Sequence, residues 1–159
     1  MRKIIRVVAS PTSLDVFLKE QMVYLSSDFE VIGVASPGEG HEKVRAAGIR
    51  TEEINIERPI RIWSDIKSLW KLYTFFRKEK PDIVHSITPK AGLLSMTAAW
   101  LARVPVRMHT FTGLLFPWKR GVLKAILKTT DRITCLFATF INQFTLKNKW
   151  LNSRFKRRY

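Results

Sequence analysis

The chain has 159 residues, of which 46% are hydrophobic and 26% charged, and this composition is that of one ordinary globular domain. It excludes collagen-like, low-complexity and intrinsically disordered classes. The single cysteine, Cys135, excludes an intramolecular disulfide and gives no sign of an oxidising compartment. No run approaches the roughly 18 apolar residues of a membrane-spanning helix, so we predict a cytoplasmic chain, soluble or peripheral to a membrane.

The charge is less ordinary, because 28 Lys and Arg stand against 13 Asp and Glu, which gives a net charge of +15 at pH 7. Residues 119–159 hold 11 of these bases and only one acid, Asp131, and so carry +10 (11 − 1) of the total. A surplus of this size favours contact with polyanions. Nucleic acid, an anionic membrane and phosphorylated small molecules all fit, and composition does not choose among them.

Short runs of β-branched residues alternate with longer segments of helical period along the chain. This alternation predicts an α/β fold, a Rossmann-like doubly wound parallel sheet with helices on both faces. Ligands of such sheets bind beyond the carboxyl ends of the strands, where the strand order reverses. The predicted strands are residues 4–9, 31–35, 51–56, 83–86 and 106–110, and the predicted helices are residues 14–25, 41–47, 64–80, 92–102 and 121–133.

The first of these helices has a clear start signal and an apolar face. Residues 12–15, Thr-Ser-Leu-Asp, fit the capping pattern of Ser or Thr followed three residues later by an acid. The spacing then predicts one buried face, formed by Leu14, Phe17, Leu18, Met22 and Leu25.

The segments that leave the predicted strands are rich in hydroxyl groups, Gly and Pro. They are residues 10–13, 36–40, 87–92 and 110–113, and the first three run into a helix N-terminus, where free amides attract anions such as phosphate. Ser, Thr, Pro and Gly are also what ordinary strand-to-helix turns use. The pattern therefore favours a phosphorylated ligand at this edge and leaves ordinary turns as the alternative.

Common nucleotide and hydrolase motifs do not occur in the sequence. Gly38 and Gly40 begin a Gly-x-Gly, but Lys43 stands where a dinucleotide fingerprint needs its third Gly, and the segment follows the second strand. No phosphate-binding loop, zinc-hydrolase or serine-hydrolase motif is present, and no Cys/His cluster has zinc spacing. We therefore predict no metal site.

Three side chains are candidates for direct ligand contact. His85 and His109 end predicted strands, and an imidazole there can hydrogen-bond to a hydroxyl or phosphate oxygen. Lys90, two residues before Gly92, is a candidate anion contact. The alternatives are structural histidines that are hydrogen-bonded inside the protein and a solvated lysine.

Four bases recur at four-residue spacing in the last predicted helix and form one stripe. Beside the aromatic residues of the preceding loop, such a helix can rest on anionic lipid. The alternative is an ordinary helix that covers the sheet and has a solvated outer face. The stripe consists of Arg120, Lys124, Lys128 and Arg132.

Three stretches carry a resemblance to a known family: SPTSLDVFLKEQMVYL, VIGVASPG and RKEKPDIVHSITPKAGLLSMTAAWLARVPVRMHTFTGLLFP, of which PDIVHSITPKAG and VPVRMHTFTG are the most specific. They resemble the N-terminal domain of glycosyltransferase family 4, especially bacterial enzymes of capsular and O-antigen polysaccharide assembly. The resemblance covers residues 1–139. It implies the N-terminal half of a GT-B fold, in which two Rossmann-like domains face each other across a cleft and usually need no metal.

In such enzymes the N-terminal domain holds mainly the acceptor and the other domain holds the nucleotide-sugar donor. The resemblance implies that the acceptor is a polyprenyl-diphosphate-linked sugar at an anionic membrane surface, so that the protein is peripheral at the cytoplasmic face of the inner membrane. No cofactor is implied beyond the nucleotide sugar, which is a substrate. His109 matches the family histidine that approaches the donor sugar, and the acceptor-side positions are Thr12, Ser13, Thr88, Lys90 and Gly113.

Residues 140–159 do not continue the resemblance and contain no acid. We therefore expect a truncated or frameshifted chain after residue 139, inactive unless a separate chain supplies the donor domain. Two other readings stay open. One is a basic nucleic-acid-binding module, because Trp150, Phe155 and Tyr159 stand among six Lys and Arg from Lys147 onward. The other is a nonfunctional remnant.

Overall fold

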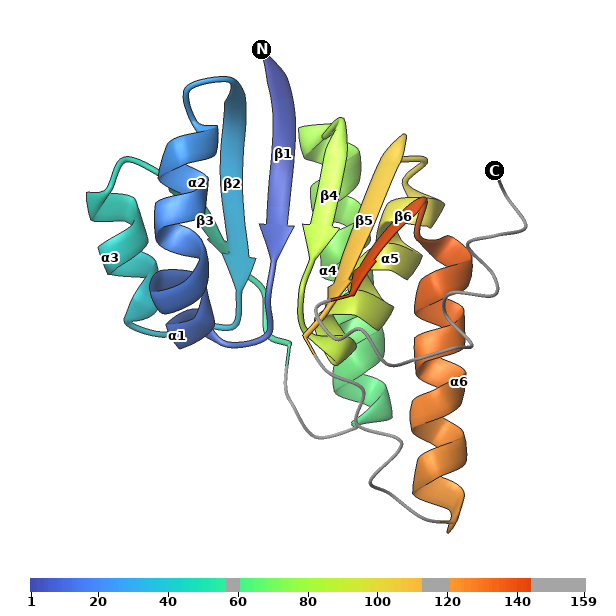
Figure 1. The fold of residues 1–159 in the computed structure, drawn as a ribbon. Helices are drawn as coiled ribbons and strands as arrows, with labels where there is room; N and C mark the ends of the chain where they lie inside the picture. The colour runs from blue at the N-terminus through green and yellow to red at the C-terminus, as the bar shows by residue number, and fades with distance from the viewer. Residues whose placement is uncertain (57–60, 113–120, 144–159) are drawn as a thin grey trace.

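The protein contains one parallel β-sheet with helices on both faces (Figure 1). The structure, a computed structural model, describes residues 1–56, 61–112 and 121–143. In this part of the chain the six strands lie in the order β3-β2-β1-β4-β5-β6. The predicted Rossmann-like α/β fold is thereby confirmed. The strands are β1 (Arg2–Val7), β2 (Phe29–Ala35), β3 (Arg50–Glu53), β4 (Ile83–Ser86), β5 (Val106–Phe111) and β6 (Phe140–Gln143).

The helices that connect β1 to β2 and β2 to β3 lie on one face of the sheet, and those that lead into β4, β5 and β6 lie on the other (Figure 1). A continuous helix of three parts follows β1, namely α1 (Pro11–Ser13), the π-helical turn η1 (Leu14–Leu18) and α2 (Lys19–Leu25), and it shares one face with α3 (Gly40–Ala46). The opposite face carries α4 (Ile62–Glu79), α5 (Pro89–Leu101) and α6 (Gly121–Phe137).

Each face of the sheet has its own apolar core, because successive residues of a strand point to opposite sides. In β1, Ile5 belongs to the core beneath α4 and α5, whereas Ile4 belongs to the core beneath η1 and α2. The core under α4 and α5 includes Val34, Leu72, Phe76, Val84, Leu94 and Met96, and the other core includes Leu14, Leu18, Met22, Val31 and Val44.

The π-helical turn changes which side chains of the first helix face the sheet. The sequence pattern placed Phe17 on the buried face, and this prediction was wrong, since Phe17 is 69% exposed. A π-helix has more residues per turn than an α-helix, so residues four apart line up and the residue at i+3 turns outward. Leu14, Leu18 and Met22, at that spacing, are all buried.

The strand β6 is absent from the sequence-based prediction. It pairs in parallel with β5, with Met108 opposite Phe140, and so completes the sixth position of the sheet. Thr139, the residue before β6, already bonds to β5, since its backbone N–H donates to the Arg107 carbonyl at 2.7 Å. Among the described strands, β3 and β6 form the two edges of the sheet.

The strand order reverses between β1 and β4. The chain builds outward from β1 to β2 and β3, then crosses to β4 and builds in the other direction to β5 and β6. β1 and β4 are hydrogen-bonded neighbours, with Val7 opposite Ser86, so the loops that follow them emerge side by side. This switch point at the carboxyl edge is where a doubly wound sheet binds its ligand.

Candidate functional site

The loops that follow β1 and β2 pack directly on each other at this edge. A Cβ atom on Gly40 would collide with the carbonyl oxygen of Pro11, and one on Gly38 would lie 2.6 Å from Pro11 Cγ. The backbone therefore needs glycine at both positions. Thr12 and Ser13 follow Pro11 in the first helical turn after β1. Thr12 is exposed and Ser13 is half-buried.

The hydroxyl group of Ser36 in the second loop has a structural role. Ser36 Oγ accepts a hydrogen bond from the Ile56 backbone N–H at 2.8 Å, and the Ser36 carbonyl lies 3.0 Å from His41 Nε2. The first contact joins the loop after β2 to the segment after β3, and the second joins it to α3. Because Ser36 is engaged within the protein, this loop is better described as an ordinary strand-to-helix turn than as a ligand contact.

The loop after β4 connects the two sides of the switch point. Thr88 is the N-cap residue of α5, and its Oγ1 accepts a hydrogen bond from the backbone N–H of Ala9 at 3.2 Å. Lys90 follows in the first turn of α5, where its Nζ lies 2.6 Å from Asp65 Oδ1. This ion pair joins the first turns of α4 and α5. Asp65 is a partner that sequence reasoning missed, because no local pattern relates the two positions.

His109 lies inside the protein. Its ring is fully buried between β5 and α5, and Nδ1 shares a hydrogen bond of 2.8 Å with Ser86 Oγ. A Cβ atom on Gly92 of α5 would lie 2.7 Å from Nδ1, so the helix backbone rests directly on the imidazole. The ring also meets Phe111 edge to face, with centroids 4.4 Å apart.

The other ring nitrogen of His109, Nε2, is buried without a hydrogen-bond partner among the described residues. Burial lowers the pKa of His109 to about 4, so the ring is neutral at pH 7. This geometry is the one expected of a structural histidine that is hydrogen-bonded inside the protein. The catalytic assignment of His109 stays a prediction. Sequence reasoning did not find Ser86, the hydroxyl that holds the ring.

His85, on the opposite face of the sheet, is also held by a hydroxyl group. Its Nε2 lies 2.9 Å from Thr110 Oγ1 on the neighbouring strand β5. Burial lowers the pKa of His85 to about 3. The positive charge of Arg6, which lies opposite His85 on the neighbouring strand β1, lowers this pKa further. His85 and His109 are therefore held apart by the sheet and do not form one catalytic pair.

We expect the rings of His85 and His109 to stay neutral in the folded protein from pH 8 down to about pH 5. Since their folded pKa values of about 3 and 4 lie below the ordinary 6.5, the unfolded chain binds protons first. The free energy of unfolding should therefore fall as the pH drops below 6.5. NMR titration of the ring Cε1–H signals tests this, with the urea-unfolded chain as control, and a folded-state midpoint near 6.5 for either ring would contradict it.

The remaining predicted positions are only partly within the described structure. Lys128 and Arg132 are exposed on α6, as the basic stripe requires. Arg120 and Gly113 lie outside the described residues, and so does the side chain of Lys124. In the described part of the chain, no helix has the length and hydrophobicity needed to cross a membrane.

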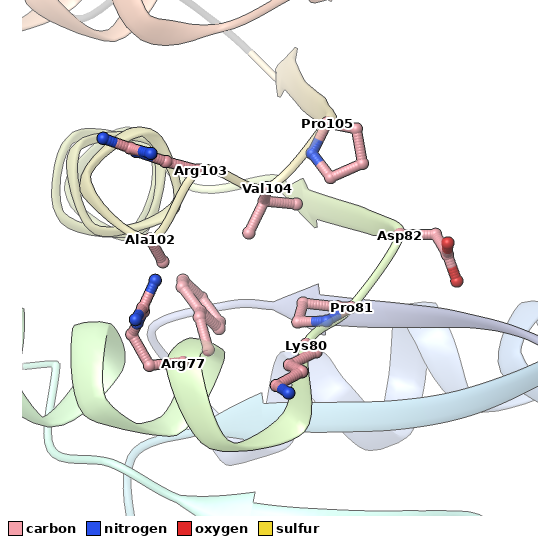
Figure 2. Close-up of a pocket in the computed structure, with 9 residues that line it drawn as sticks. Arg77, Lys80, Pro81, Asp82, Ala102, Arg103, Val104 and Pro105 are labelled. Atoms are coloured by element: carbon pink, nitrogen blue, oxygen red, sulfur yellow. The ribbon is translucent and has the colours of Figure 1, made fainter.

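A pocket of about 430 Å³ opens at the other end of the sheet, beside the amino ends of β4 and β5 (Figure 2). Two helix ends meet there, and both Lys80 and Arg103 adopt a left-handed backbone, with φ of 48° and 60°. None of the sequence-predicted site residues belongs to this pocket. Its lining consists of Phe76, Arg77, Lys80, Pro81, Asp82, Ala102, Arg103, Val104 and Pro105.

The fold is that of a Rossmann-like domain, and its candidate ligand surface lies at the switch point. Residues 18–141 match the Glycosyl transferase 4-like domain, and the protein belongs to this family. The sequence resemblance to family 4 glycosyltransferases is thereby confirmed.

Two known glycosyltransferases are similar to this chain in sequence. The chain is 39% identical over 102 residues to the capsular polysaccharide biosynthesis glycosyltransferase CapM of Staphylococcus aureus, a match that covers 63% of this chain and 27% of CapM. It is 41% identical over 88 residues to the UDP-Gal:alpha-D-GlcNAc-diphosphoundecaprenol alpha-1,3-galactosyltransferase of Escherichia coli, a match that covers 50% of this chain and 23% of that enzyme. The chain thus spans about a quarter of the length of either relative.

Solved structures share the fold at low sequence identity. UDP-GlcNAc 2-epimerase from Methanocaldococcus jannaschii superposes with a TM-score of 0.62 at 18% identity, over 97% of this chain and 43% of the epimerase. MurG from Acinetobacter baumannii gives 0.62 at 16% identity, over 89% of this chain and 41% of MurG. Anabaena Alr3699/HepE, solved with UDP and glucose, gives 0.65 at 13% identity, over 89% of this chain and 38% of HepE.

Proposed function

We propose that this protein is the acceptor-side domain of a glycosyltransferase that moves a sugar from a nucleotide-sugar donor to a lipid-linked or polysaccharide acceptor. The observation that carries the proposal is the carboxyl-edge switch point, where the loop after β1 and the first turn of α5 meet, in a member of the Glycosyl transferase 4-like family. The names of the two relatives support both acceptor classes, since one is a capsular polysaccharide enzyme and the other acts on a diphosphoundecaprenol-linked sugar.

A diphosphate-linked sugar matches the chemistry of this edge. The N-terminus of the 13-residue helix α5 presents backbone N–H groups beside Thr88 and Lys90. An ammonium group has three N–H donors, so Lys90 can contact both the Asp65 carboxylate and a phosphate oxygen. Thr12, Ser13 and Gly113 complete the acceptor side in the proposal. For His109 to act at the donor sugar, its buried Nε2, which has no partner among the described residues, would have to become accessible to the donor.

We further propose that these 159 residues do not complete the reaction by themselves. Transfer requires the acceptor hydroxyl to be held against the donor while the departing nucleoside diphosphate is stabilised. The proposal assigns donor binding to a second domain of similar size, carried by a separate chain or by further residues of a longer one. The location that follows is the cytoplasmic face of the inner membrane, where the basic stripe of α6 contacts anionic lipid.

The acceptor side is tested by calorimetric titration of the purified chain with a short-chain prenyl-diphosphate-linked N-acetylglucosamine. We expect binding that Lys90→Gln weakens about ten-fold, the size of one lost charge-assisted hydrogen bond. Lys43→Gln is the matched control, because Lys43 is an exposed lysine that also pairs with an aspartate, Asp15, but lies on α3. Equal affinities of the Lys90 variant and wild type would refute the assignment.

The transfer reaction is tested with radiolabelled nucleotide sugars and the same acceptor. We expect no turnover by the purified chain, and turnover when the missing domain is supplied as a second polypeptide. Measurable transfer by the chain alone would overturn the proposed division between acceptor and donor domains.

A further inference from the structure

The first half of α4 exposes an unusual number of large apolar side chains. Trp63 is 79% exposed and Trp70 65%, while Ile62 is 70% and Ile66 51% exposed. These four residues, the α4 patch, fall on one side of the helix, because positions 62, 66 and 70 are four apart and 63 and 70 are seven apart. Exposed apolar patches of this kind mark contact sites for other proteins or for membranes.

Exposed lysines lie beside the α4 patch in a row of their own. Lys67 and Lys71 are one turn apart on α4 and both are exposed. Asp65, the acid in the first turn of α4, lies 2.6 Å from the Lys90 ammonium, so its charge is balanced inside the protein. The surface that α4 offers thus combines tryptophans with positive charge.

This combination fits the interface of an anionic membrane. Tryptophan prefers the headgroup boundary because its ring is apolar and its N–H is polar, and lysines on the neighbouring face meet the negative headgroups. The chain has 28 bases and 13 acids, which give it a net charge of +15. Because like charges repel, another basic protein, including a second copy of this chain, is disfavoured as the partner.

The position of the α4 patch connects it to the carboxyl edge of the sheet. The start of α4 extends past the ends of the strands (Figure 1), and the Asp65–Lys90 ion pair fixes it beside the first turn of α5. A bilayer in contact with the α4 patch would therefore lie next to the switch-point loops.

We propose that Ile62, Trp63, Ile66 and Trp70 of α4, with Lys67 and Lys71, form the surface on which this protein docks to an anionic lipid bilayer. The α4 patch is a lipid contact in addition to the α6 stripe, so the proposal deepens the membrane location given under the proposed function. It does not depend on sugar transfer, because lipid binding is measured without donor or acceptor.

The test is co-sedimentation of the purified chain with sucrose-loaded vesicles. One set contains phosphatidylcholine alone, and the other contains phosphatidylcholine with phosphatidylglycerol at a molar ratio of about 3:1, a negative surface that attracts basic residues. We expect binding to the anionic vesicles that weakens as salt increases, and a partition coefficient at least about ten-fold lower for the double variant Trp63→Gln/Trp70→Gln. Lys67→Gln/Lys71→Gln should lower binding to anionic vesicles only.

The control is Tyr24→Gln, which removes an aromatic side chain that is 80% exposed on α2, on the opposite face of the sheet. This variant should bind as wild type does, and all variants should keep the wild-type thermal midpoint. Trp63 and Trp70 are mostly exposed and belong to neither core, so their replacement leaves both cores intact and removes only the ring contact of Trp70 with Tyr73.

Three results would overturn the proposal. The first is wild-type binding that does not distinguish anionic from neutral vesicles. The second is binding by the double tryptophan variant equal to that of wild type, and loss of binding by Lys128→Gln/Arg132→Gln would then leave the α6 stripe as the lipid contact. The third is a dimer in analytical ultracentrifugation that the double tryptophan variant abolishes, which would show that the α4 patch binds a second copy.

Discussion

Replacement of Glu79 by Gln should lower the free energy of unfolding at pH 7 by about 2 kcal/mol, as expected when a carboxylate that is only 7% exposed loses its charge beside two cationic partners. Glu79 is the last residue of α4, where the helix dipole disfavours an anion. Its carboxylate is compensated by Arg50 Nη2 at 2.6 Å and by Lys3 Nζ at 2.8 Å. These contacts join α4 to the starts of β3 and β1, and urea unfolding measures their loss.

The same carboxylate gives the protein a pH dependence with a definite sign. The hydrogen bond from Arg50, followed by that from Lys3, lowers the pKa of Glu79 from 4.5 to about 2. The stabilisation is thus complete above pH 4.5 and is lost as the pH falls toward 2. Glu79→Gln should lack this component. Glu53→Gln is the control, because the Glu53–Arg45 pair has a similar N–O distance of 2.9 Å but is exposed, so its loss should cost less than about 1 kcal/mol. Equal losses for the two variants would contradict the prediction.

Replacement of Gly92 by Ala should destabilise the protein by about 2 kcal/mol, the usual cost of overpacking a well-packed core. Alanine ordinarily favours a helix over glycine by about 1 kcal/mol, so the contact must overcome that gain. The new methyl group would lie 2.7 Å from His109 Nδ1 and 3.0 Å from Nε2. Rotation of the ring would break its hydrogen bond to Ser86, and movement of α5 would open the core beneath it.

A double-mutant cycle separates the clash from helix propensity. In a His109→Ala background the space above Gly92 is open, and Gly92→Ala should there be neutral or stabilising by up to about 1 kcal/mol. The four proteins are compared by thermal and urea unfolding. Stabilisation by Gly92→Ala in the wild-type background would contradict the close contact between α5 and the ring.

Local patterns were sufficient for most of the fold. Five strands and the helices between them follow from the change between β-branched runs and helical spacing, and the parallel sheet follows from their alternation. The strand β6 could not be recognised because it has only four residues and directly follows α6 without a glycine or proline between them. Its strand conformation comes from pairing with β5, which is a tertiary effect.

The candidate site was predictable in position but not in side-chain detail. The edge of the sheet and the loops at Thr12 and Thr88 follow from the rule for doubly wound folds. The orientation of His109 does not, because whether a strand residue faces α5 or the opposite side depends on the register between β4 and β5. The burial of His109 and the pairing of Lys90 with Asp65 both arise from segments far apart in the sequence.

The two edges of the described sheet differ in whether they allow further growth. β3 is a four-residue strand with three charged residues, Arg50, Glu52 and Glu53, and such strands discourage the addition of another strand. The other edge strand, β6, has the uncharged sequence Phe-Ile-Asn-Gln. Of these two edges only that of β6 has a composition that accepts a new neighbour, so a further strand, or under crowded conditions a strand of another molecule, would extend the sheet from that side.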